Sequence, residues 1–128
     1  MKTIETKTEI ITLRNDGIVH CIAKNGISIE LEDAKENILA IAKISPKLPK
    51  PVLVDIRQSS GASKEARKYF GSDEVAVVQS AVALLVDSGL SKLLGNFFVG
   101  LNKPIFPLKL FTNEQEALNW LKSISIKV

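Results

Sequence analysis

The chain has 128 residues, of which 45% are hydrophobic and 24% charged, and its formal net charge is +3. This composition excludes a disordered or fibrous chain, and the length suits one compact domain over residues 1–128. We expect the domain to fold alone or as a homodimer. The Lys and Arg residues are scattered, and aromatic residues make up only 5%, so we expect no nucleic-acid partner.

The expected cellular location follows from two features that the sequence lacks, a signal peptide and a membrane span. Residues 1–10 alternate charged with apolar residues and contain no apolar segment typical of a signal peptide. No run approaches the roughly 18 consecutive apolar residues of a membrane span. The lone Cys21 has no disulfide partner and no metal-ligand spacing around it. We therefore expect a cytoplasmic protein with a buried thiol and no membrane contact.

The N-terminal part is predicted to form a hairpin followed by a helix. Two β-type segments, residues 7–14 and 18–24, are joined by Asn15-Asp16-Gly17, and Asp-Gly between such segments is a strong hairpin signal. After a second turn at Asn25-Gly26, apolar residues recur at helical spacing from Leu31 to Ser45. Acidic residues open this segment and a lysine closes it, which suits the helix dipole.

Two nearly apolar segments, Val52–Ile56 and Ala81–Val86, read as strands buried on both faces of a sheet. Between them, Ser63 is expected to cap a helix that runs to Phe70, with Gly71 in the left-handed conformation after its end. A short helical piece should follow over residues 72–79, with Ser72 as its cap.

The last third repeats the pattern of helix and strand. Apolar residues at helical spacing from Leu90 to Leu101 predict a helix, and Pro107–Phe111 predicts a strand. A capping box of Thr112 and Gln115 should then open the final helix. That helix presents its apolar residues at helical spacing: Ala117, Leu118, Leu121 and Ile124.

The alternation of strands and helices predicts the α/β class. An opening antiparallel hairpin is followed by βα units, which form a mostly parallel mixed sheet with helices packed against it.

Several short stretches after residue 50 carry a family resemblance. They are L-V-D-I-R at 53–57, E-A-R-K-Y-F at 65–70, A-L-L-V at 83–86, G-N-F-F at 95–98, N-K-P at 102–104 and K-L-F-T-N-E-Q-E-A-L-N-W-L at 109–121. With this element order, the chain resembles the SpoIIAA-like fold of STAS domains (sulphate transporter and anti-sigma factor antagonist). It is similar, more closely, to a group of small uncharacterised bacterial proteins with that fold.

The resemblance implies a regulatory site at the helix after the strand Val52–Ile56. STAS antagonists carry a phosphorylatable serine at the start of that helix and bind an anti-sigma kinase through the same surface. The corresponding positions here are Ser63 and Lys64, although Ala62 replaces the preceding Asp of the family pattern.

The sequence contains no complete motif for phosphoryl transfer, nucleophilic catalysis or phosphate binding. Asp55 and Lys103-Pro104 are similar to the reactive Asp and Lys of response regulators, but no acidic pair follows the first strand to hold Mg²⁺. Asp55 is instead expected to pair with Arg57 or to accept loop N–H groups. No Ser or Cys nucleophile occurs together with His20 in a recognisable catalytic motif. We therefore expect His20 to be a hydrogen-bonded structural histidine. No Gly-rich phosphate motif occurs. We therefore expect no enzyme activity, no metal and no cofactor.

Polar residues gather after the two buried strands, at what should be one edge of the sheet. Serines and cations there would attract an anion, a phosphoserine or an acidic partner. The first loop and helix start contribute Arg57, Ser59, Ser60, Ser63, Lys64 and Arg67, and the second loop contributes Ser88, Ser91 and Lys92. A purely structural account is that the serines cap helices and the cations keep the surface solvated.

Two functions from different classes follow. The first is a non-enzymatic regulatory or protein-interaction module, switched by phosphorylation or anion binding at residues 57–67, with a protein partner that the sequence does not identify. The alternative is a carrier of a small apolar ligand or lipid, with a cavity between sheet and helices lined by Phe97, Phe98, Phe106 and Trp120.

Overall fold

The computed structural model describes residues 2–87 and 106–126, and these residues form a six-stranded mixed sheet with helices on both faces. The strands lie in the order β1-β2-β3-β5-β7-β8. Strands β1 to β3 pair antiparallel, whereas β3, β5, β7 and β8 pair parallel. The predicted mostly parallel α/β sheet is thereby confirmed. Its strands are β1 (Lys2–Glu5), β2 (Glu9–Leu13), β3 (Val19–Ala23), β5 (Lys50–Asp55), β7 (Gln79–Leu85) and β8 (Leu108–Phe111).

The predicted opening hairpin is present as β2 and β3, with Gly17 in the turn at a φ of +85°. Gly26, in the second predicted turn, also has a positive φ of +71°. A conformation of this kind favours glycine because it has no Cβ. The expectation of a two-stranded opening was incomplete, since β1 extends it to three strands, with Lys2 paired to Leu13. Most side chains of β1 are exposed, which removes the alternating pattern that would reveal a strand.

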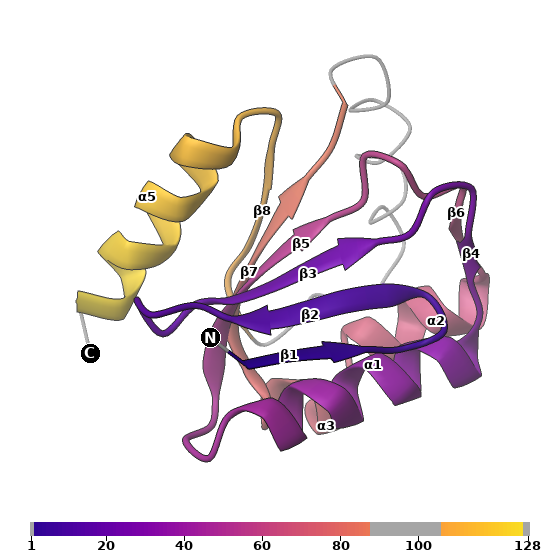
Figure 1. Cartoon of the computed structure of the whole chain (residues 1–128), viewed down its shortest axis with the longest axis horizontal. Helices are drawn as coiled ribbons and strands as arrows, with labels where there is room; N and C mark the ends of the chain where they lie inside the picture. Colours follow the sequence, from indigo (N-terminus) through magenta and orange to yellow (C-terminus); the bar gives the residue numbers. More distant parts are fainter. Residues whose placement is uncertain (1, 88–105, 127–128) are drawn as a thin grey trace.

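The helices divide the structure into two layers around the sheet. The first layer contains α1 (Leu31–Ile44), α2 (Lys64–Phe70) and α3 (Asp73–Ala76), while α5 (Glu114–Ile126) lies apart on the opposite face (Figure 1). Each layer has its own apolar core. The larger core includes Ile11, Val19, Ile41, Ile44 and Val52, and the core under α5 includes Ile18, Leu53, Leu85, Leu118 and Leu121.

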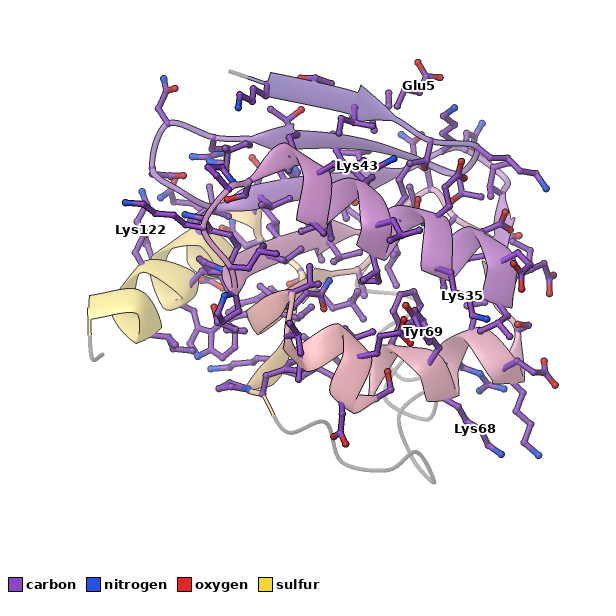
Figure 2. All side chains as sticks on the ribbon, turned by 90° about the horizontal axis from the view of Figure 1, so that it is seen from below. Glu5, Lys35, Lys43, Lys68, Tyr69 and Lys122 are labelled. Carbon is purple, nitrogen blue, oxygen red and sulfur yellow. The ribbon has the colours of Figure 1, made fainter. Side chains whose placement is uncertain are left out.

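Helices α1 and α2 lie side by side, with Tyr69 between them and Lys68 directed to solvent (Figure 2). A third, smaller apolar cluster of Ile29, Ala34 and Ala66 fills the space at their N-terminal ends. The start of α2 is thus held against α1, which fixes where the first predicted site residues lie.

A second, two-stranded sheet joins the connections that lead into α1 and α2. It consists of β4 (Ser28–Ile29) and β6 (Gly61–Ala62), paired parallel. Further backbone bonds extend the pairing: the Gly26 N–H donates to the Gln58 carbonyl at 2.8 Å, and the Ser60 N–H donates to Ile27 at 2.9 Å. We call this small sheet and its flanking bonds the loop clasp. It ties the β5–α2 connection to the β3–α1 connection.

The ends of α2 and α3 confirm one predicted cap and correct two others. Ser63 caps α2 as expected, its hydroxyl accepting the Ala66 N–H at 3.1 Å. Gly71 has a φ of −94°, so the predicted left-handed conformation was wrong. Ser72 stands at the N-cap position of α3 but its hydroxyl makes no cap hydrogen bond.

The predicted capping box of α5 was wrong by one residue. The side chain of Asn113, not of Thr112, accepts the Glu116 N–H at 2.9 Å, and Gln115 donates instead to Asn119 within the helix. Both Thr and Asn are good N-caps, so the residue types alone do not decide between neighbours. The helical stripe predicted from Leu90 to Leu101 lies outside the described residues. Among the helices that are described, none is long and apolar enough to cross a membrane.

Candidate functional site

The segment from β5 to α2 contains the first group of predicted site residues. Ser59 and Ser60 make bonds within the loop clasp: the Ser59 hydroxyl accepts the Gly61 N–H at 3.1 Å, and the Ser60 hydroxyl donates to the Gly26 carbonyl at 3.4 Å. Ser63 is half-buried at the cap of α2, beside the exposed Lys64. Arg67 is half-buried one turn further along the same helix. These hydroxyls therefore have structural bonds whether or not they also have a regulatory role.

Arg57 is separated from this group by its bonds to Asp55. Its backbone N–H and Nε donate to Asp55 Oδ1 at 3.1 and 3.0 Å, and its terminal nitrogen donates to Oδ2 at 2.7 Å. Burial works to raise the pKa of Asp55, but the bonds from Arg57 outweigh it and hold that pKa below its usual value. This pairing was predicted from the sequence.

The predicted residues thus lie along one connection without converging on one point. Arg57 is occupied by Asp55, Ser59 and Ser60 belong to the loop clasp, and Ser63 belongs to the start of α2. The second predicted loop, with Ser88, Ser91 and Lys92, lies outside the described residues.

A cluster that the sequence did not predict lies beside Arg57, on the face of the sheet that α5 covers. The side chains of His20, Asp55 and Glu114 each place a ligand atom within 4.8 Å of the others. His20 comes from β3, Asp55 ends β5, and Glu114 begins α5. We call these residues the 20/55/114 cluster.

Strand register explains how the cluster forms. Ile22 of β3 is the register partner of Asp55, so His20, two residues earlier, points to the same face of the sheet. Asp55 lies at the carboxyl end of its strand, and α5 begins just after β8, at the same edge. The first residue of α5 thereby reaches the two strand residues. Three segments distant in sequence are needed, so no short motif could reveal the cluster.

His20 is the unusual member of this cluster. Its Nε2 is buried and has no hydrogen-bond partner among the described residues, and it lies 4.0 Å from Glu114 Oε1. Burial lowers the pKa of His20, against the opposing effect of Glu114 and Asp55. At neutral pH the imidazole is therefore mainly neutral, with a lone pair on one nitrogen. The expectation of a hydrogen-bonded structural histidine does not hold for Nε2.

The opposite face contains a buried polar group next to α1. Glu9 of β2 is only 4% exposed, and burial raises its pKa to about 7. Nearby, the buried Asn37 of α1 accepts a hydrogen bond from the Thr6 hydroxyl and donates to Thr8 at 2.9 Å. Cys21 is also buried here, as predicted, and burial raises the pKa of its thiol. A thiol in this state is a poor nucleophile.

The described residues predicted to line an apolar cavity do not lie together. Phe106 is buried in the core beside α1, whereas Trp120 packs in the core under α5, its ring 5.6 Å from that of Phe111. These two predicted lining residues lie on opposite faces of the sheet, so they do not line a common cavity. The other two, Phe97 and Phe98, lie outside the described residues.

Two solved structures are similar to this chain. An uncharacterised protein of the DUF3478 family from Shewanella loihica PV-4, described as having a SpoIIAA-like fold, superposes with a TM-score of 0.51 at 18% identity, over 94% of this chain and 90% of that one. A protein of unknown function from Arthrobacter sp. FB24 is 34% identical, over 92% of this chain and 95% of that one, with a TM-score of 0.37. No curated protein matches. The first likeness confirms the predicted SpoIIAA-like fold.

The family follows from the sequence match. Residues 11–125 match a family model described as a domain of unknown function, DUF7793. This match spans both layers of helices, the residues of the loop clasp and the 20/55/114 cluster. The chain therefore belongs to the DUF7793 family.

Proposed function

We propose that this protein is a non-enzymatic regulatory module that binds a protein partner through the start of α2 and the loop clasp. Phosphorylation of Ser63 is the proposed switch. The observation that carries the proposal is the position of Ser63, whose hydroxyl is the N-cap of α2 beside the exposed Lys64.

The chemistry of the cap supports this role for Ser63. A phosphate adds about 1.5 to 2 negative charges at neutral pH. Negative charge near the start of a helix is stabilised by the helix dipole and by the free backbone N–H groups there. Phosphorylation would therefore leave the fold intact while it changes the charge that a partner meets.

The loop clasp supplies the rest of the proposed surface. Gly26, Gln58 and Ser60 are exposed on the two connections that the clasp joins, and Lys64 is exposed at the start of α2. A partner that contacts α2 would therefore also contact the turn before α1. The surface contains polar and cationic groups, which suit an acidic or polar partner surface.

The test compares partner binding by four folded proteins: the parent, Ser63→Asp, Lys64→Glu and Lys43→Glu. Lys43 is an exposed lysine near the C-terminal end of α1 (Figure 2), so its charge reversal is a matched control. Each protein is immobilised in native extract, and captured proteins are quantified by mass spectrometry. We expect Ser63→Asp and Lys64→Glu to lose a partner that the parent and Lys43→Glu both retain.

Equal partner profiles from all four proteins would reject this surface. The switch itself is checked separately, by intact-mass and fragment analysis of the protein from its native cells. A phosphate assigned to Ser63 is expected. If phosphate occurs only at another residue, the interaction proposal stands but Ser63 is not its switch.

The non-enzymatic part of the proposal has its own test. A hydrolase and transferase screen of the parent, with divalent metals added, should show no turnover. Turnover that disappears in a folded His20→Gln variant would show that the 20/55/114 cluster is catalytic.

A further inference from the structure

We propose that the 20/55/114 cluster is a binding site for a divalent first-row transition ion such as Zn²⁺, held by His20 Nε2 and the carboxylates of Asp55 and Glu114. This site is independent of the surface proposed above, because its ligands come from β3, β5 and the first residue of α5, whereas Ser63 caps α2. Metal binding can therefore fail while the regulatory proposal holds, and the reverse is also true.

The ligand set matches this class of ion. One imidazole and two carboxylates combine the nitrogen donor that Zn²⁺, Fe²⁺ and Ni²⁺ favour with oxygen donors that neutralise their charge. Ca²⁺ and Mg²⁺ favour oxygen ligands alone. Among the described residues, His20 Nε2 has no hydrogen-bond partner, so in the tautomer protonated at Nδ1 the lone pair of Nε2 is available to a metal.

The distances require only a small contraction. Ligand atoms around a tetrahedral Zn²⁺ lie roughly 3.4 Å apart, and those of the cluster lie within 4.8 Å of one another. His20 and Asp55 are fixed by neighbouring strands, with side chains only 17% and 10% exposed. The side chain of Glu114 is 45% exposed, so it can rotate to close the site. Two fixed ligands and one mobile ligand also leave a path for the ion to enter.

Arg57 is the group that a metal must accommodate. It donates to both carboxylate oxygens of Asp55, yet its own side chain is 41% exposed and can shift outward. A carboxylate oxygen has two lone pairs. Asp55 Oδ1 already accepts two bonds from Arg57, whereas Oδ2 accepts one, so Oδ2 has a lone pair left for the metal. Arg57 would then orient Asp55 from the second coordination sphere. The two carboxylates of the cluster outnumber the one guanidinium beside them, and this excess of negative charge favours a cation.

The lone histidine gives the site a specific spectroscopic probe. The chain contains one His, so the imidazole signals in a ¹⁵N NMR spectrum of the full, tag-free chain come from His20 alone. We expect Zn²⁺ to shift these signals at one equivalent, whereas Mg²⁺ leaves them unchanged. Calorimetry should give one Zn²⁺ per chain.

The variants compare two glutamates of the same helix turn. Glu114→Gln removes a proposed ligand, and we expect it to weaken Zn²⁺ binding about tenfold or more. Glu116→Gln makes the same chemical change at an exposed position outside the cluster, and should bind Zn²⁺ as the parent does. His20→Gln should abolish tight binding.

Two outcomes would overturn the proposal. Unshifted His20 signals at saturating Zn²⁺ would show that the imidazole is not a ligand. Equal Zn²⁺ affinity in the parent, Glu114→Gln and Glu116→Gln would show that His20 binds the ion without the cluster. Because each variant changes one polar group at low structural cost, circular dichroism of the metal-free proteins checks that folding is intact.

Discussion

The described helices cover the two faces of the sheet to different extents. On one face, α1, α2 and α3 lie over a core that reaches from β2 to β7, with Ile11, Val52 and Val82 among its members. On the other, α5 covers β5, β7 and β8. The remainder of that face, on β1 to β3, includes the paired Ile10 and Ile22, which are 39% and 40% exposed.

This difference separates two uses of buried polar groups. Under α1, Asn37 is satisfied by Thr6 and Thr8, as the interior of a stable core requires. At the border of the region that α5 covers, His20 Nε2 is buried and accepts or donates no hydrogen bond within residues 2–87 and 106–126. At this border three polar side chains converge, and that of Glu114 is 45% exposed.

The largest expected effect tests whether the two cores unfold independently. Ile41→Ala under α1 and Leu121→Ala under α5 each remove a fully buried side chain and should cost about 2 to 5 kcal/mol of unfolding free energy. Hydrogen exchange should show that Leu121→Ala exposes α5 while α1 stays protected. The control is Leu39→Ala, at a residue of α1 that is 61% exposed.

If Leu121→Ala lowered the protection of α1 and α5 equally, the two faces would be one cooperative unit. If Leu39→Ala cost as much as Ile41→Ala in urea unfolding, the assignment of the buried face of α1 would be wrong.

Glu9 gives the face under α1 a pH dependence. Its pKa in the folded protein, about 7, lies above the 4.5 of an unperturbed Glu. The folded state therefore binds the proton more tightly. The resulting stability is fully present below pH 4.5 and is lost as pH rises through 7. Glu9→Gln should remove this dependence, so between pH 5 and 8 the variant should gain about 2 kcal/mol relative to the parent.

The difference between the two proteins isolates Glu9 from other titrating groups, including His20, whose lowered pKa acts in the opposite direction. Urea midpoints at several pH values measure it. A constant difference across this range would mean that Glu9 titrates as a solvated carboxyl.

An effect of similar size is expected from the polar contacts of Asn37. Asn37→Ala leaves Thr6 and Thr8 without a side-chain partner in a buried site, which should cost about 2 kcal/mol. Thermal unfolding measures the loss. A double variant that also carries Thr8→Val should recover part of it, because the orphaned hydroxyl is removed. No recovery would show that Asn37 acts through packing alone.

The smallest effect concerns the cap of α5, the only described helix on its face. Asn113→Ala should destabilise the protein by about 1 kcal/mol, because the Glu116 N–H loses its acceptor. Thr112→Ala should change the melting temperature much less. Equal losses would mean that both residues cap the helix in solution.

The fold was predictable where burial controls the sequence. β7 is buried at six of its seven residues and β5 has no exposed residue, so their apolar residues alone identified them. β1 was missed because three of its four side chains are exposed. The cap of α5 was misplaced because Thr112 and Asn113 are adjacent and both can cap, so backbone conformation decides.

The candidate sites differ in the same way. Ser63 was predictable as a cap because hydroxyl and helix are local in sequence. The 20/55/114 cluster depends on the register of β3 against β5 and on where α5 begins. The order of strands in the sequence predicts which strands are adjacent but not the register between them. A shift of one residue in that register would turn His20 to the other face of the sheet.

The loop clasp has a consequence for how a partner would meet the start of α2. A single peptide group, Ile29–Glu30, accepts the Ser63 N–H at 2.9 Å through its carbonyl and donates its own N–H to Asp33 at 2.9 Å. The two connections are therefore held together by hydrogen bonds and form one continuous surface. A partner that binds this surface would find the loops already in their bound arrangement. Its association would then lose little loop entropy, and its affinity would depend on shape and charge.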